Sequence, residues 1–246
     1  VESLLEDLRD PSHRAAEQEL KDLEALAGFA LKPWDVSYWS EQLRQQRFDL
    51  DTEALRPWFP LPQVLDGLFD LCGRLFDIRI SAADGEAPIW HQDVRFFRVS
   101  DASSGEALAA FYLDPFSRPG SKRGGAWMDD CLGRHCSPDG NKVLPVAYLI
   151  CNQTPPVGDT PSLMSFGEVE TLFHEFGHAL HALFGRANNL SLAGYNTKID
   201  FVELPSQILE EWLYEPQILN MISSHFESNK PLDQKVLEKK IGIFQK

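Results

Sequence analysis

The sequence predicts a mainly α-helical fold that contains a small β-sheet. Apolar residues recur at helical spacing in long stretches near both ends, and the middle of the chain has a hairpin pattern. No internal repeat and no Gly- or Ser-rich linker divides the 246 residues. We therefore expect one continuous domain over residues 1–246, helical over 1–80, with a small sheet over 90–151 and two principal helices over 165–220.

The individual elements follow from turn and cap signals. A Ser-Ser-Gly turn predicts a hairpin over 94–113, and a segment rich in Gly, Pro and basic residues predicts a loop over 115–125. The apolar run 143–151 predicts a buried strand beside the hairpin. Helices are expected over 2–28 with an interruption at Pro11 and an end at Gly28, and over 36–47, 62–76, 165–184, 200–220 and 236–245.

Composition excludes several classes of partner. With 43% hydrophobic residues the chain can bury a core, and 37 acidic against 23 basic residues give a net charge of −14. This charge disfavours nucleic acid and anionic membrane surfaces. No apolar run approaches the roughly 18 to 20 residues of a membrane helix. We expect neither nucleic acid nor a membrane as a partner, and a monomer.

Four cysteines in so long a chain do not form a disulfide framework, which favours reduced thiols and an intracellular protein. The chain opens at Val1 without an initiator Met or a targeting segment, and both ends are typical of the interior of a longer protein. We expect the cytoplasm, or the interior of a chloroplast or mitochondrion if a targeting segment has been removed.

The helix over 165–184 has the clearest signals in the chain. Ser165 and Glu168 form a capping-box pattern, and Gly185 stands where a left-handed residue would end the helix. Its polar side carries three histidines, His174, His178 and His181. The opposite side, which we expect to face the core, carries Val169, Leu172, Phe173, Phe176, Leu180, Leu183 and Phe184.

The spacing of His174, Glu175 and His178 predicts a metal site. Two imidazoles one helical turn apart can bind one Zn²⁺, and a Glu beside the first His points at a water in the open coordination position. The metal polarises a carbonyl while Glu175 accepts the proton of the water and passes it to a leaving amine. This chemistry suits hydrolysis of an amide bond. His181 is open to three interpretations: a third ligand, a partner of a ligand, or a plain polar-face residue; we favour the last two.

The third ligand is expected on the following helix. An elongated zinc-protease pattern would need Gly at 181 and His at 184, and the chain has His181 and Phe184 there. A carboxylate from a neighbouring helix is the alternative, and Glu203 is the first in position to reach the metal if the two helices lie antiparallel. On local signals, the alternative for Glu203 is a capping carboxylate paired with Asp200.

A face of 200–220 that carries Glu203, Gln207, Glu210 and Tyr214 is expected to meet the histidine face. Glu210, or Glu170 from the first helix, could then accept a hydrogen bond from a ligating His. The other face of 200–220 carries Phe201, Val202, Ile208, Leu209, Trp212 and Leu213.

These motifs closely resemble the thimet oligopeptidase family of zinc peptidases, within it the branch of oligopeptidase A and its plant organellar relatives. The resemblance runs from about residue 4 to the end of the chain. It rests on residues 174–181 (HEFGHALH), 200–207 (DFVELPSQ), 123–130 (RGGAWMDD), 145–148 (PVAY) with 151–152 (CN), 31–35 (LKPWD), 55–59 (LRPWF) and 93–97 (DVRFF).

The resemblance implies a zincin-type metallopeptidase. His174, His178 and Glu203 would be the ligands of one Zn²⁺ per chain, and Glu175 would be the general base. The family fold is a helical ellipsoid with a channel that admits short unstructured peptides, and this chain would be part of its catalytic domain. Family members carry a further His and Tyr downstream that stabilise the tetrahedral intermediate, so we expect an incomplete oxyanion arrangement in these 246 residues.

The resemblance therefore implies a zinc endopeptidase of short peptides. Two alternatives remain open. Residues 183–186 (LFGR) and 193–197 (AGYNT) look more like the related dipeptidyl carboxypeptidases, which would release C-terminal dipeptides. A non-catalytic fragment or binding module, in which zinc contributes only folding energy, is the other alternative.

Overall fold

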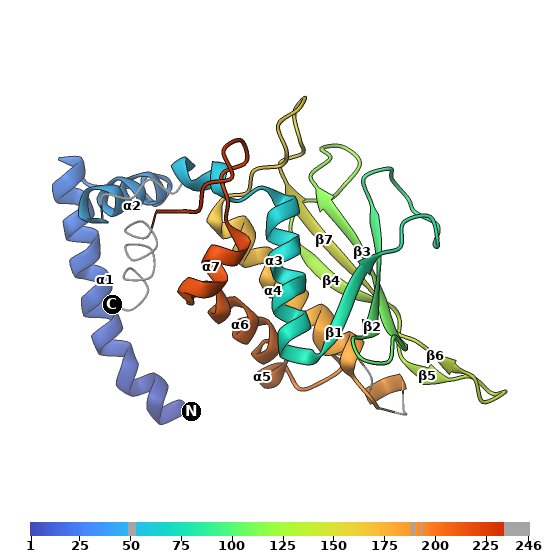
Figure 1. The fold of residues 1–246 in the computed structure, drawn as a ribbon. Helices are drawn as coiled ribbons and strands as arrows, with labels where there is room; N and C mark the ends of the chain where they lie inside the picture. The colour runs from blue at the N-terminus through green and yellow to red at the C-terminus, as the bar shows by residue number, and fades with distance from the viewer. Residues whose placement is uncertain (49–52, 188–189, 193, 234–246) are drawn as a thin grey trace. The chain divides into compact units, whose positions relative to one another are not determined.

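The computed structural model describes residues 1–48, 53–187, 190–192 and 194–233 (Figure 1). These residues fall into two compact units, residues 1–48 and residues 53–233, which are described separately. The extent of the domain stays a prediction. The helix expected over 236–245 lies outside the described residues.

The first unit is a pair of helices, α1 (Glu2–Ala27) and α2 (Pro33–Phe48). The predicted interruption at Pro11 is wrong, because α1 runs through it. The fixed φ of proline near −65° is compatible with a helix, so Pro11 removes a hydrogen bond without ending the helix. Gly28 does end it, with φ 79° and its N–H donating to the Glu24 carbonyl.

The second unit begins with the 3₁₀ turn η1 (Glu53–Trp58) and the helix α3 (Leu61–Phe76), which confirms the helix expected over 62–76. A five-stranded sheet follows, in the order β1-β2-β3-β7-β4. Its strands are β1 (Ile78–Ala82), β2 (Arg95–Asp101), β3 (Ala107–Phe116), β4 (Trp127–Leu132) and β7 (Val146–Gln153), and a separate small pair is formed by β5 (His135–Cys136) and β6 (Lys142–Val143).

The predicted hairpin is confirmed, because β2 and β3 pair antiparallel with Phe97 opposite Phe111. The predicted strand beside it is also confirmed, since β7 pairs with β3, in parallel orientation. Sequence reasoning missed β1, a strand of five residues in which only Ile78 is buried. Among the described residues, β4 pairs with β7 only and is an edge of the sheet.

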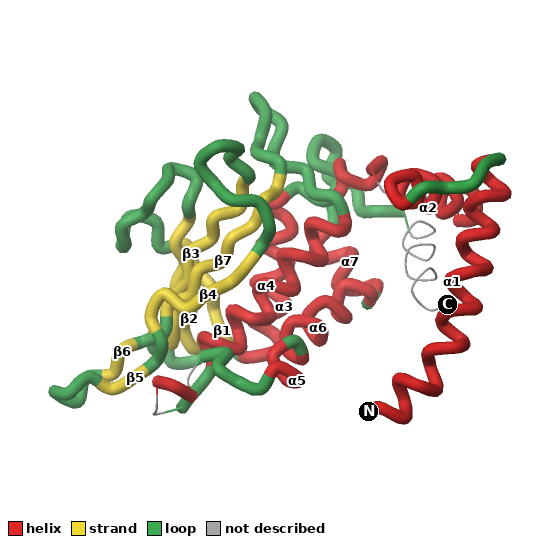
Figure 2. Tube along the Cα trace, turned by 180° about the vertical axis from the view of Figure 1, so that it is seen from behind, coloured by secondary structure: helices red, strands yellow, loops and turns green. Residues whose placement is uncertain are grey.

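The core lies between one face of the sheet and the helices α3 and α4 (Phe166–Phe184), with α6 (Leu204–Glu211) and α7 (Pro216–Ile222) packed behind them (Figures 1 and 2). Phe111 of β3 and Phe176 of α4 are fully buried, and their ring centroids are 5.4 Å apart. Phe69 of α3 packs against both rings. The amphipathic pattern of α4 thus seats the histidine-bearing helix on the sheet.

The single helix predicted over 200–220 is wrong. The chain instead forms α5 (Ile199–Val202), α6, the 3₁₀ turn η3 (Trp212–Tyr214) and α7. Pro205 has no N–H to bond the carbonyl of residue 201, and Pro216 keeps Glu215 in an extended conformation, so each proline breaks the helix. Each of the two resulting helices still buries an apolar side chain, Leu209 in α6 and Ile218 in α7.

Two predicted end signals also differ from the structure. The residue before α5 is Lys198, and Asp200 lies inside that turn, so the predicted capping box of Asp200 and Glu203 is absent. Gly185 follows the last residue of α4 as predicted, but with φ −54° and ψ 127°. The chain leaves α4 in an extended conformation that needs no left-handed residue.

Candidate metal centre

The start of α4 is held by a capping box, as predicted. The Ser165 hydroxyl accepts a hydrogen bond from the Glu168 N–H (3.2 Å), and the Glu168 carboxylate accepts one from the Ser165 N–H (2.6 Å). Arg56 of η1 also donates to the Glu168 carboxylate (2.7 Å). These bonds satisfy donors at the helix start and fix where each later residue of α4 points.

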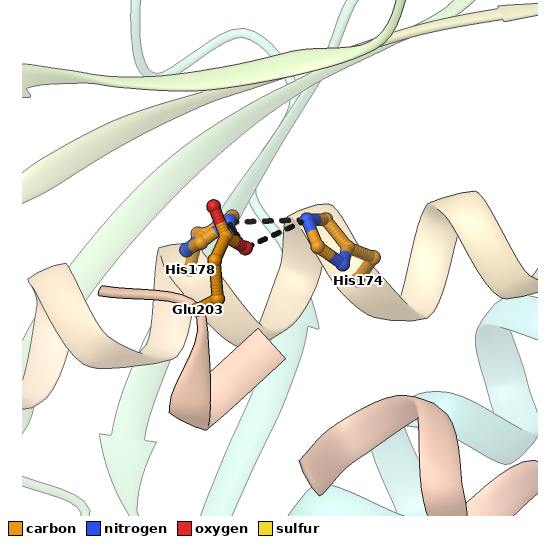
Figure 3. Close-up of side chains that lie close together, drawn as sticks. All are labelled: His174, His178 and Glu203. Carbon is orange, nitrogen blue, oxygen red and sulfur yellow. Dashed lines mark hydrogen bonds and ion pairs between the residues drawn. The ribbon is translucent and has the colours of Figure 1, made fainter. Parts of the chain in front are cut away.

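His174, His178 and Glu203 meet at one point (Figure 3). The two Nε2 atoms are 3.2 Å apart. The Glu203 Oε2 atom lies 3.3 Å from His174 Nε2 and 3.1 Å from His178 Nε2. Within the described ranges this is the one cluster of three or more His, Cys, Asp or Glu side chains whose donor atoms are close enough to share a metal.

The spacing of these three donors fits a zinc ion. In a tetrahedral site with metal–ligand distances of about 2.0–2.1 Å, neighbouring ligand atoms lie about 3.3 Å apart. Two imidazole nitrogens and one carboxylate are also the donor set of a catalytic zinc site, in which the fourth position stays open. The geometry therefore supports a metal centre built by these three side chains.

Glu203 reaches the histidines because α4 and α6 touch through their backbones. A Cβ atom at Gly177 would lie 2.5 Å from the Ser206 Cα and 2.8 Å from the Pro205 carbonyl oxygen, so only glycine fits. The Ser206 hydroxyl donates to the Glu203 carbonyl oxygen (2.8 Å) and lies 3.0 Å from Oε2. Sequence reasoning missed Gly177 and Ser206 as positioning residues, although both are small residues inside the two motifs.

A carboxylate holds His174 from the other side. Glu210 on α6 accepts a hydrogen bond from His174 Nδ1, which leaves Nε2 facing Glu203 and His178. The sequence suggested Glu210 or Glu170 for this contact. Glu170 instead accepts a hydrogen bond from the Tyr214 hydroxyl. Carboxylates behind ligating histidines fix the tautomer and raise the basicity of the ligand.

Burial lowers the pKa of His178, and the positive charges of His174 and His181 act in the same direction, against the charge of Glu203. A neutral imidazole is the form that binds a metal. His181 is outside the cluster, and its ring packs against Phe201. Burial lowers the pKa of His181 as well. The structure therefore does not place His181 as a third ligand.

Glu175 faces the same cavity as the metal cluster. This cavity of about 300 Å³ lies between α4, the α5–α6 junction and the first residues of β4. Burial raises the pKa of Glu175; the charge of Glu203 adds to this effect, and the charge of His174 opposes it. The cavity is lined by Ala126, Trp127, Met128, His174, Glu175, His178, Tyr195, Val202 and Glu203.

A helix that presents two histidines and a glutamate to a cavity, with a second carboxylate from the next helix, is an arrangement expected of a peptidase site that could hold a metal. Comparison with known proteins agrees with this class. The profile of Peptidase family M3 matches residues 1–245, and the chain belongs to this family. The resemblance to thimet-type oligopeptidases described above is thereby confirmed, as is a mainly helical fold with a small mixed sheet.

Three relatives illustrate the similarity. Organellar oligopeptidase A, chloroplastic/mitochondrial, of Arabidopsis thaliana is 49% identical over 96% of this chain and 31% of its own length. Oligopeptidase A of Escherichia coli is 41% identical over 98% of this chain and 36% of its own length. Dipeptidyl carboxypeptidase of Escherichia coli is 39% identical over 93% of this chain and 34% of its own length. The chain thus spans about a third of the length of these relatives.

Proposed function

We propose that the chain carries the zinc site of a metallopeptidase that hydrolyses internal bonds of short, unstructured peptides. The observation that carries this proposal is the meeting of His174, His178 and Glu203 at 3.1–3.3 Å, with Glu175 in the same cavity. His174, His178 and Glu203 would hold one Zn²⁺. When bound, Zn²⁺ supplies Lewis-acid polarisation of a carbonyl or a water.

Glu175 is proposed as the general base. Its carboxylate accepts a proton from the attacking water and then donates that proton to the leaving amine. Burial raises the pKa of Glu175, which makes its carboxylate a stronger base toward the proton of the water. Glu210 acts indirectly, since it orients His174.

The edge strand β4 supports an extended peptide as the substrate. β4 pairs with β7 on one side only, and Ala126, Trp127 and Met128 at its start line the metal cavity. An unpaired edge offers main-chain donors and acceptors to another extended chain. An unstructured peptide can adopt the extended conformation that pairs with this edge, which favours unstructured peptides as substrates.

The test is hydrolysis of a quenched fluorescent peptide by the chain and by its Glu175→Gln variant, with zinc measured in both. We expect the variant to bind zinc but to lose at least about 10²-fold in kcat. Glu211→Gln, an exposed neighbour of Glu210, is the control and should retain activity. Undiminished hydrolysis by Glu175→Gln would contradict the proposal. Bound zinc without hydrolysis, in the full-length protein as well as in the chain, would favour a non-catalytic, zinc-stabilised module.

Release of C-terminal dipeptides is the second candidate function. The support for this candidate is sequence identity. The chain is 39% identical to dipeptidyl carboxypeptidase of Escherichia coli, which is close to its 41% identity to oligopeptidase A of the same organism. Mass spectrometry of the products distinguishes the two functions. Internal fragments from a peptide with an amidated C-terminus would support an endopeptidase, whereas stepwise loss of dipeptides from a free C-terminus would support the alternative.

We further propose that the protein acts inside the cell, as a monomer, on peptides and not on nucleic acid. The names of the relatives include organellar and cytosolic oligopeptidases, which supports an intracellular site. In the part of the chain that the structure describes, none of the helices is long and apolar enough to cross a bilayer. Sedimentation of the purified protein and fluorescence microscopy of the tagged full-length protein test these points.

A further inference from the structure

A second cavity of about 420 Å³ shares the residue Trp127 of the edge strand β4 with the metal cavity. Trp127 lies opposite Ile150 of β7 in the sheet, and Ile150 also lines the second cavity. A peptide that extends from the metal cavity past Trp127 would therefore enter the second cavity with one of its neighbouring residues.

The walls of this second cavity are aromatic. Trp90 and Trp127 are 48% and 43% exposed, which is high for tryptophan in a folded unit. The Trp90 ring packs edge-on against Tyr148, with centroids 5.5 Å apart, and the Trp90 indole N–H donates to the buried Asp114 (3.0 Å). The hydrogen bond and the packing hold an exposed aromatic face in a fixed orientation, ready to contact an apolar side chain.

The floor of the cavity is positively charged. Asp114 is 2% exposed and accepts hydrogen bonds from Arg118 (2.8 and 2.6 Å) and from Lys122 (3.0 Å). Two cations therefore face one buried carboxylate. The hydrogen bond to Asp114 and then the charges of Asp114 and nearby Asp93 raise the pKa of Arg118, so this guanidinium stays charged.

Arg123 adds a third cation at the rim. Its side chain is exposed, and among the described residues it has neither a hydrogen bond nor an ion pair. Arg118, Lys122 and Arg123 thus bring three cations to one cavity of a chain whose net charge is −14.

We propose that this cavity binds a carboxylate of the peptide substrate, with the apolar part of the same residue against Trp90 and Trp127. Arg123 is the cation that contacts the carboxylate, and the paired Arg118 and Lys122 supply a positive background. The carboxylate comes either from the C-terminus of the peptide or from an Asp or Glu side chain. This inference rests on the proposed function only for the identity of the ligand as a peptide.

Binding of small probes tests the site without requiring turnover. The first pair of probes is N-acetyl-phenylalanine, which carries a terminal carboxylate, and its amide, which is neutral. The second pair is N-acetyl-glutamic acid α-amide, which carries a side-chain carboxylate, and the corresponding glutamine compound, which is neutral. Tryptophan fluorescence titration of the full chain should show tighter binding of one carboxylate probe than of its neutral analogue. The pair that shows this difference identifies the source of the carboxylate. Equal binding within both pairs would overturn the proposal.

Two variants locate the binding. Arg123→Gln should raise the Kd of the preferred carboxylate probe about 5- to 30-fold, since an ionic hydrogen bond is lost. Arg79→Gln on β1, at the opposite edge of the sheet, removes the same charge and should leave the Kd unchanged. Carboxylate binding that survives Arg123→Gln would place the probe elsewhere, for example on the metal, and would overturn the proposal.

The outcome is separable from that of the proposed function. If the chain hydrolyses no peptide but binds the carboxylate probe through Arg123, the binding site stands and the peptidase proposal fails. If the chain hydrolyses peptides but amidation and Glu→Gln changes in the peptide leave KM unchanged, the peptidase proposal stands and the carboxylate site is wrong.

Discussion

The backbone of Gly177 on α4 lies against that of Ser206 on α6, so that a Cβ atom at Gly177 would be 2.5 Å from the Ser206 Cα. This contact sets the distance between the two helices. Glu203 precedes Ser206 by less than one helical turn, and its carboxylate lies beside His174 and His178. The proposed metal centre thus depends on a glycine that offers no ligand of its own.

Gly177→Ala should therefore weaken the metal centre. The added methyl group pushes α6 away from α4, which displaces Glu203 and costs about 1–3 kcal/mol in the free energy of unfolding. Zinc affinity, measured by competition with a chromophoric chelator, should fall together with the urea midpoint. Gly167→Ala in the same helix is the control, because the nearest atom to its Cβ is 3.9 Å away. Unchanged zinc affinity in Gly177→Ala would show that the contact does not position Glu203.

Glu210→Gln should reduce zinc affinity by about 10- to 100-fold, as is typical when a partner behind a ligating histidine is altered. The glutamine can still accept a hydrogen bond from His174 Nδ1, but it lacks the negative charge that makes the imidazole a stronger ligand. Chelator competition measures the change. Glu211→Gln, which changes the same charge on the exposed side, is expected to bind zinc like the parent chain.

Zinc should stabilise the folded chain through the three predicted ligands. A metal that binds only the folded state adds about 2.7 kcal/mol at a free concentration of 100 times its Kd. The thermal midpoint should rise with zinc in the parent chain and should not rise in His178→Ala. His13→Ala changes an exposed histidine of α1 and should respond to zinc as the parent does. An equal rise in His178→Ala would exclude His178 as a ligand.

Asp114→Asn should destabilise the chain at pH 7 by about 3 kcal/mol, because Arg118 and Lys122 would lose a buried partner. Burial raises the pKa of Asp114, but hydrogen bonds from Arg118, Trp90 and Lys122 outweigh burial and hold the pKa below its ordinary value. The folded state therefore favours the charged carboxylate.

The stabilising effect of Asp114 has a defined pH dependence. It is fully present above the pKa of the unfolded chain, about 3.9, and is lost as the pH falls through the lower pKa of the folded chain. Urea unfolding of the parent and of Asp114→Asn should thus differ most near neutral pH and converge below about pH 4. Asp159→Asn, at an exposed turn, should follow the parent at every pH.

Much of the local structure followed from short-range patterns. The capping box of Ser165 and Glu168, the apolar stripe of α4 and the pair β2–β3 all depend on residues close in sequence. Several of the errors came where a proline competed with a periodic pattern. Pro11 was expected to interrupt α1 and did not, whereas Pro205 and Pro216 broke a segment that was expected to be one helix.

The sequence by itself determined that His174 and His178 share one face of a helix, with Glu175 about 100° round from His174, because helical spacing alone places them there. Only the tertiary structure decided that Glu203 completes the cluster and that Glu210, not Glu170, holds His174. It also decided that Trp90, Asp114 and Arg118 gather beside Trp127. The reason is physical: contacts between distant segments depend on how closely two backbones approach, and this approach is set by packing, as at Gly177 and Ser206.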